Sequence, residues 1–116
     1  MIHVFLDDCR RPPAGFVLAR TAEECLLLLE DGDVDMLSLD HDLGFDEANG
    51  TELVKQMVLR NVYPREIFLH TSSPFGRREM YELLYQHKPE HVKLHYGPMT
   101  PEALERARLA SDDARD

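Results

Sequence analysis

The sequence predicts an α/β fold, built in three layers around a mostly parallel five-stranded sheet. Short apolar runs alternate with segments of helical spacing, an order typical of a parallel sheet covered by helices on both faces. The chain has 116 residues, 43% apolar and 30% charged, which suits one hydrophobic core. We therefore expect one domain over residues 1–110. The polar segment SDDARD, 111–116, is expected to form a flexible C-terminal tail.

The first part of the chain predicts two strands with no helix between them. The first strand is IHVFL, 2–6. The segment RRPPAG, 10–15, contains two prolines and a glycine, which exclude a regular helix. The first helix of the alternation is therefore shortened or missing. A second strand over 16–20 leads into a helix that begins with a capping box formed by Thr21 and Glu24.

From the third strand onward the pattern alternates regularly between strand and helix. Apolar spacing, proline and glycine positions and the capping residue Thr100 define the boundaries. The expected elements are a strand over 36–39, a helix over 51–61, a strand over 66–70, a helix over 77–87, a strand over 91–96 and a helix over 101–110.

Polar and titratable side chains follow these strands at their carboxyl ends. They are Asp7 and Asp8 after the first strand, Asp40, His41 and Asp42 after the third, His70, Thr71 and Ser72 after the fourth, and His95 after the last. In a parallel sheet the carboxyl ends meet at one edge, where ligands bind in open α/β folds. We expect these groups to lie along one edge.

The acidic groups at this edge predict a cation site. Carboxylates that lie close together repel one another unless one is protonated or a cation lies among them. Oxygen ligands of this kind suit Mg²⁺ better than Zn²⁺. The candidate ligands are Asp7, Asp8, Asp40 and Asp42. The alternative is that these residues are solvated turn acids or helix caps.

Groups that fit a phosphate are expected beside the acids. Thr71 and Ser72 open a loop that leads into a helix N-terminus, which favours anions. Arg77 begins that helix, where a positive side chain gains nothing from the helix dipole, and an anion nearby would explain it. Arg10 follows the acidic pair directly. The alternative is a solvated basic face.

Four residues are candidates for catalysis: Asp40, His41, His70 and Thr71. Asp40 could act as a nucleophile. A histidine at a strand end could move protons near neutral pH, or could serve as a hydrogen-bonded partner of a ligand residue. Cys9 is not a candidate nucleophile, because the neighbouring negative charge should raise the pKa of its thiol.

Charge and cysteine content restrict the class of protein. With 13 basic and 22 acidic residues, the net charge is −9, which disfavours an extended nucleic-acid surface but allows a local phosphate pocket. Cys9 and Cys25 form no disulfide framework, so we expect reduced thiols in a cytoplasmic protein. No leader pattern and no run long enough to span a bilayer is present, so no membrane association is expected.

Four side chains resemble the acidic pair, phospho-acceptor and switch hydroxyl of response-regulator receiver domains: Asp7-Asp8, Asp40 and Thr71, in that order. The segments NGTELVKQM and YGPMTPEALE resemble later segments of the same domains. The resemblance implies a flavodoxin-like or receiver-like fold. It implies that Asp8 and Asp40 ligate Mg²⁺ directly and Asp7 through water. The backbone carbonyl of Asp42 would be a third ligand, and Thr71 would contact a phosphoryl group.

The chain also departs from ordinary receivers. The position of the usual lysine at the end of the last strand is Gly97, and Lys93 is expected to point elsewhere. The segments LDDCRRPP, DHDLG and HTSSPFGRREM resemble instead the divergent cyclic-phosphate-processing receiver family. That resemblance implies handling of cyclic phosphate ends, as in RNA repair.

Three hypotheses on function remain open. The first is metal-assisted binding or processing of a phosphate group on a small molecule or nucleic-acid end. The second is a signalling switch in which Asp40 is phosphorylated and the effect passes to a protein partner. The third is a non-catalytic receiver-like module that only binds another protein.

Overall fold

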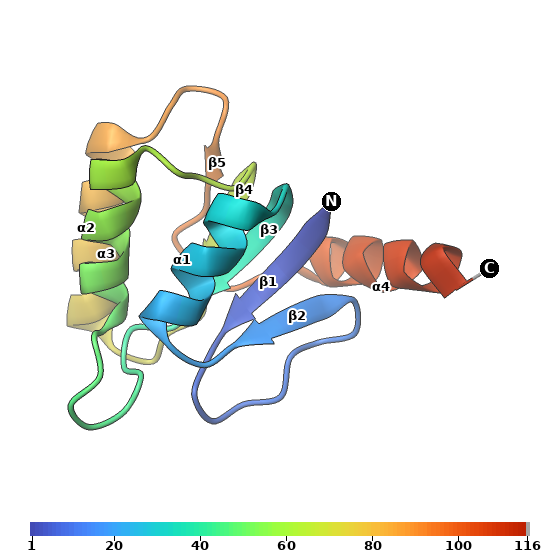
Figure 1. Ribbon diagram of the computed structural model, residues 1–116, viewed down its shortest axis with the longest axis horizontal. Helices are drawn as coiled ribbons and strands as arrows, with labels where there is room; N and C mark the ends of the chain where they lie inside the picture. The colour runs from blue at the N-terminus through green and yellow to red at the C-terminus, as the bar shows by residue number, and fades with distance from the viewer. Residues whose placement is uncertain (116) are drawn as a thin grey trace.

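All five strands of the sheet run parallel, in the order β2-β1-β3-β4-β5 (Figure 1). The computed structural model describes the backbone of residues 1–115 and the side chains of residues 1–110. The strands are β1 Ile2–Leu6, β2 Phe16–Ala19, β3 Val34–Leu39, β4 Glu66–Leu69 and β5 Lys93–Leu94. The helices are α1 Ala22–Asp31, α2 Gly50–Arg60, α3 Pro74–His87 and α4 Pro101–Arg115. The predicted α/β fold and five-stranded parallel sheet are confirmed.

The helices cover the sheet unequally. Helices α1, α2 and α3 lie on one face and α4 lies on the other (Figure 1). The alternation of side chains along β1 explains the two layers: Val4 and Leu6 belong to the core under the three helices, whereas Phe5 packs with Phe68 and the α4 residue Ala107. No helix among the described residues is long and apolar enough to cross a membrane.

The predicted loss of the first helix is confirmed by the link from β1 to β2. Parallel neighbours usually need a crossover of about a dozen residues or more, commonly helical. Here residues 7–15 make the crossover without a helix. Gly15 ends it at a φ of +91°, and a Cβ at this position would overlap the backbone carbonyl of Ala107. The glycine therefore lets the link pass directly against α4.

Several boundaries differ from the sequence prediction. Helix α3 begins three residues early, at Pro74, because the Ser73 hydroxyl accepts a hydrogen bond from the Gly76 amide at 3.1 Å and caps it. The last strand is only Lys93–Leu94, shorter than the predicted 91–96. The tail predicted over 111–116 falls on residues whose side chains lie outside the described part of the chain, so its flexibility stays a prediction.

Candidate functional site

The strand register brings three titratable side chains to one level. Leu6, Leu39 and Leu69, the last residues of β1, β3 and β4, are paired neighbours across the sheet. The ladder continues one step further, since the Asp40 amide donates to the Leu6 carbonyl and the His70 amide to the Leu39 carbonyl. Asp7, Asp40 and His70 therefore leave the carboxyl edge side by side.

Among the described residues, Asp7, Asp40 and His70 form a group with one potential metal-ligating atom each, all within 4.8 Å of one another. We call these three residues the edge cluster. The prediction that side chains from separate strand ends meet at one edge is confirmed for them.

Asp7 is held firmly in the edge cluster. Its side chain is almost fully buried, and its Oδ1 accepts hydrogen bonds from the backbone amides of Cys9 and Arg10, both at 2.9 Å. Its Oδ2 lies 3.1 Å from Nε2 of His70. The turn after β1 therefore fixes one carboxylate oxygen and directs the other toward the histidine.

His70 is held on both sides of its ring. Nδ1 lies 2.6 Å from the hydroxyl oxygen of Ser38, a buried residue of β3, and the ring stacks on Phe5 with 4.4 Å between centroids. Ser38 was not among the predicted site residues. A hydroxyl within the apolar strand sequence MLSL was the signal that could have found it, because a buried polar group needs a partner.

Asp40 is the more accessible carboxylate of the edge cluster. Its Oδ1 accepts a hydrogen bond from the His41 amide at 2.8 Å. Thr71 is buried, and its hydroxyl oxygen accepts from the Ser73 amide at 3.1 Å. Its side chain also acts on Asp40, where it partly opposes the burial that raises the pKa of that carboxyl. Thr71 thus joins the edge cluster to the start of α3.

The surroundings move the two carboxyl pKa values in opposite directions. For Asp7, burial alone would raise the pKa, but the backbone amides of Arg10 and Cys9 and the His70 ring outweigh it, so the pKa is lowered. For Asp40, burial and the charge of Asp7 raise the pKa. Burial lowers the pKa of His70, against the opposing effect of Asp7. Carboxyl groups separated in this way are typical of sites that hold or move protons.

His41 points away from the edge cluster. Its ring lies against the backbone of Gly76 in α3, where any Cβ would overlap it, and its Nδ1 lies 3.0 Å from Oδ1 of the exposed Asp42. Its Nε2 is buried and has no hydrogen-bond partner among the residues whose side chains the structure describes. The structure therefore brings neither the His41 ring nor the Asp42 carboxylate into the edge cluster.

The predicted phosphate-binding residues lie around the carboxyl edge, and their side chains differ in how firmly they are held. Arg77 is tied down, because its Nη2 donates to the Thr71 carbonyl at 2.7 Å and its guanidinium lies over the Tyr96 ring. Arg10 is exposed, and its positive charge contributes to the lowered pKa of His70. Ser72 is exposed beside Thr71. Among the residues whose side chains the structure describes, Arg10 is an exposed arginine whose charge acts on the edge cluster.

Asp8 lies beside the loop that follows β3 rather than in the edge cluster. Its Oδ2 is 3.4 Å from the point where a Cβ on Gly44 would lie. The charge of Asp8 raises the pKa of the exposed Cys9 thiol, as the sequence predicted. Cys25 is a buried free thiol whose pKa is raised to about 12 by burial.

The last strand contributes less to the edge than its sequence suggested. His95 was expected near the other strand ends, but its Nε2 lies 2.7 Å from Oε2 of Glu66 and its ring stacks on Phe68. In the strand register, Lys93 lies opposite Glu66 at the amino end of β4. It therefore lies away from the edge cluster, as predicted. At Gly97 a Cβ would meet no atom within 4 Å.

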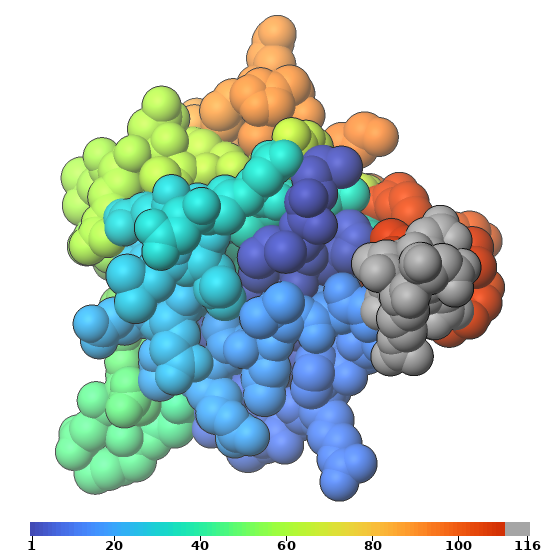
Figure 2. All heavy atoms as spheres, turned by 45° about the vertical axis from the view of Figure 1, so that its right-hand side comes forward, coloured from blue at the N-terminus to red at the C-terminus, as the bar shows by residue number. Residues whose placement is uncertain are grey.

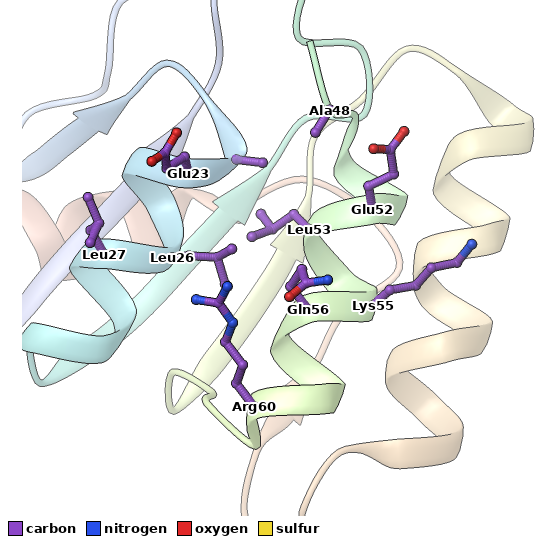
Figure 3. A pocket seen from close by; sticks show the side chains of 10 residues that line it. Glu23, Leu26, Leu27, Ala48, Glu52, Leu53, Lys55, Gln56 and Arg60 are labelled. Atoms are coloured by element: carbon purple, nitrogen blue, oxygen red, sulfur yellow. The ribbon is translucent and has the colours of Figure 1, made fainter.

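A separate groove lies between α1 and α2, lined by Leu26, Leu53, Gln56 and Arg60 among others (Figure 3). It contains none of the residues of the edge cluster. Near the carboxyl edge, the loop between β3 and α2 stands out from the surface, in green at the lower left of Figure 2, and carries Phe45 with 95% of its surface exposed.

A family model described as "Cyclic-phosphate processing Receiver domain" matches residues 2–86. The chain belongs to this family. The matched segment runs from β1 to the last turn of α3 and contains the whole edge cluster, whereas β5 and α4 lie outside it. No curated protein matches the chain.

The edge cluster fits a divalent cation. Two carboxylates and one imidazole converge there, and the mutual repulsion of Asp7 and Asp40 would be relieved by a positive charge. The donor set is not purely oxygen, since the nearest third group is a histidine nitrogen. The residues that would hold a cation are therefore Asp7, Asp40 and His70, with Asp8 at the adjacent loop.

Proposed function

We propose that this chain binds phosphate-bearing ligands at the carboxyl edge of its sheet and opens cyclic phosphate ends with the help of a divalent cation. The observation that supports the proposal is the convergence of Asp7, Asp40 and His70 within 4.8 Å in a member of this receiver family. A cation bound there would neutralise the phosphate oxygens and polarise the phosphorus centre.

In this proposal, residues of the chain would bind the phosphate ligand and activate a water molecule. Arg10, exposed near the edge cluster, would attract the anionic ligand, and the start of α3 with Ser72 would orient it. Asp40, partly exposed and with a raised pKa, would take the proton of a water molecule that attacks phosphorus. It would then return that proton to the ribose oxygen that leaves phosphorus as the ring opens. Asp7 would hold the His70 ring in place rather than react.

The proposal is tested with 2′,3′-cyclic nucleotides and with an RNA oligomer that ends in a 2′,3′-cyclic phosphate. Each is incubated with protein and either Mg²⁺ or Mn²⁺, and ring-opened products are separated by chromatography. We expect turnover that falls by about 100-fold or more in Asp40→Asn. Arg78→Ala is the matched control, because Arg78 is exposed and pairs with Glu82 on α3. Absence of both turnover and binding with either ion would exclude the proposal.

A second candidate function, phosphoryl acceptance by Asp40, is favoured by one contact. The side chain of Thr71 acts on Asp40, as would be expected of the switch hydroxyl and acceptor that the sequence resembles. The absence of a lysine at Gly97 counts against it. Treatment with acetyl phosphate, followed by intact-mass measurement, distinguishes the two functions. A stable mass increase that Asp40→Asn abolishes would favour the switch.

A further inference from the structure

The donor atoms of the edge cluster indicate which ion the site selects. Magnesium is bound almost entirely through oxygen, whereas imidazole nitrogen suits first-row transition ions such as Fe²⁺ and Zn²⁺. Of the first-row ions, Mn²⁺ is the one nearest to Mg²⁺ in its preference for oxygen, so it is the most demanding probe of a nitrogen ligand. We propose that His70 is itself a cation ligand through Nε2, together with Asp7 and Asp40, so that the site selects a first-row transition ion over Mg²⁺. The inference concerns the cation of the proposed function but does not depend on the phosphate chemistry.

The His70 ring has the support expected of a metal ligand. A ligating histidine commonly bonds its other nitrogen to a fixed partner, which sets the ring orientation. Here Nδ1 lies 2.6 Å from the hydroxyl of Ser38, which is fully buried in β3. The ring also stacks on Phe5 with only 6° between the planes. Nε2 is therefore directed at the two carboxylates with little freedom to turn away.

Ser38 is suited to both states of the ring. Without a cation, the Ser38 hydroxyl can donate to Nδ1 while Nε2–H donates to Oδ2 of Asp7 at 3.1 Å. With a cation, the ring proton moves to Nδ1 and donates to the Ser38 oxygen, which leaves the Nε2 lone pair free. A hydroxyl can both donate and accept, so the exchange needs no movement of the ring.

Positive charge from the protein is scarce at this point. Arg77 is occupied by the Thr71 carbonyl, Lys93 lies toward the other edge of the sheet, and the position of the usual receiver lysine is Gly97. Arg10 is the cation whose charge acts on His70. Two carboxylates that face one neutral ring leave a site whose charge a divalent ion balances.

The alternative is that His70 only donates a hydrogen bond to Asp7. Metal-binding measurements on the cation-free protein separate the two. Mn²⁺ is the probe, because its electron spin echo envelope modulation shows a directly bound imidazole nitrogen. Affinities for Mn²⁺ and Mg²⁺ are measured by calorimetry for wild type, His70→Gln and Ser38→Ala. His87→Gln is the control, because His87 is an exposed residue at the end of α3.

We expect imidazole modulation in wild type and in His87→Gln, and none in His70→Gln. We also expect His70→Gln to reduce the ratio of Mn²⁺ to Mg²⁺ affinity by about tenfold or more. Ser38→Ala should retain the nitrogen signal but weaken Mn²⁺ binding by about tenfold, as expected of a positioning residue. Circular dichroism checks that each variant folds, and Ser38→Ala keeps the test decisive if His70→Gln does not fold.

Three results would overturn the inference: no Mn²⁺ binding, bound Mn²⁺ without an imidazole nitrogen, or an affinity ratio unchanged by His70→Gln. Failure of the proposed function looks different, since the nitrogen signal would persist without any turnover of cyclic phosphate. Conversely, Mg²⁺-supported turnover that His70→Gln leaves intact would contradict only the assignment of His70.

Discussion

At the scale of single residues, the carboxyl edge is a place where function opposes stability. Asp40 ends a buried strand close to Asp7, and both burial and that neighbouring charge raise its pKa. A folded-state pKa above the unfolded value means that ionised Asp40 weakens the fold at neutral pH. Residues that weaken a fold in this way are common in binding and catalytic sites.

Asp40→Asn should therefore stabilise the metal-free protein while it removes the proposed activity. The amide keeps the acceptor for the His41 amide but removes the charge that faces Asp7. We expect an increase of up to about 1 kcal/mol in the free energy of unfolding at pH 7, or about 2–6 °C in Tm. The gain should vanish below about pH 3, where Asp40 is protonated in both the folded and the unfolded state. Thermal melts of wild type and variant at both pH values measure the change. A lower Tm for the variant than for wild type at pH 7 would contradict the expectation.

The ionised carboxylate of Glu66 is expected to contribute stability that the fold loses at acid pH. Burial alone would raise its pKa, but hydrogen bonds from His95 at 2.7 Å and Arg106 at 2.6 Å outweigh this and lower the pKa. A lowered folded-state pKa adds stability above the unfolded value, and this stability is lost as pH falls through the folded-state value. Glu66→Gln should cost about 1–2 kcal/mol at pH 7 and much less near pH 3. Urea unfolding across this range measures it, and a penalty independent of pH would exclude the assigned cause.

At the scale of secondary structure, tight contacts between helix starts and strand ends fix the site. Gly50 is the first residue of α2, and a Cβ there would overlap the Asp40 carbonyl and approach Sδ of Met80 to 2.6 Å. The Gly50 amide also donates to the His41 carbonyl at 2.7 Å. The start of α2 is thus in direct contact with the backbone that carries Asp40.

Gly50→Ala tests this contact. Alanine normally stabilises a helix more than glycine does. Here, however, the added methyl group must displace the Asp40 backbone or Met80. We expect a loss of about 1–3 kcal/mol in stability, together with weaker Mn²⁺ binding. Gly97→Ala is the control, since a Cβ there meets no atom within 4 Å. Equal behaviour of the two variants in chemical denaturation would contradict the proposed contact.

The strands and helices, which leave a regular spacing of apolar residues in the sequence, were predicted. Contacts that depend on three-dimensional packing were not. Periodicity located all five strands and four helices, and proline and glycine in residues 10–15 revealed the missing helix. The convergence of Asp7, Asp40 and His70 followed from the rule that parallel strands end at one edge. Strand ends and helix starts are local, so local signals were enough to find them.

The parts that the sequence could not predict depend on long-range partners. His95 follows the last strand but pairs with Glu66, 29 residues earlier in the chain. His41 adjoins Asp40 in sequence, yet its ring packs against Gly76 because α3 has no side chain at that position. The hydroxyl of Ser38 within an apolar strand was a signal in the sequence, but its partner, His70, lies 32 residues away and only the structure shows it. In each case the side chain's direction is set by a neighbour distant in sequence.

At the scale of the whole molecule, acidic charge limits what the edge can bind. The net charge is −9, and the phosphate backbone of a nucleic acid is repelled by a surface of this sign. The proposed site therefore suits one terminal phosphate rather than a length of backbone, with Arg10 as the local exception.

A 20-nucleotide RNA with hydroxyl groups at both ends should show no binding at about 150 mM salt, whereas the same RNA with a 2′,3′-cyclic phosphate end should bind in the presence of Mn²⁺. Fluorescence anisotropy compares the two. Equal affinity for both RNAs, with a steep dependence on salt, would indicate backbone binding and contradict the account.

We propose that a cation and a phosphate share the edge formed by Asp7, Asp40 and His70. The most direct measurement is the ³¹P relaxation rate of a 2′,3′-cyclic nucleotide in the presence of Mn²⁺-loaded protein. We predict relaxation several-fold faster with wild type than with Asp40→Ala at equal free Mn²⁺, because the phosphorus lies close to the bound ion only when the edge is intact. Equal relaxation rates for wild type and Asp40→Ala would contradict the claim.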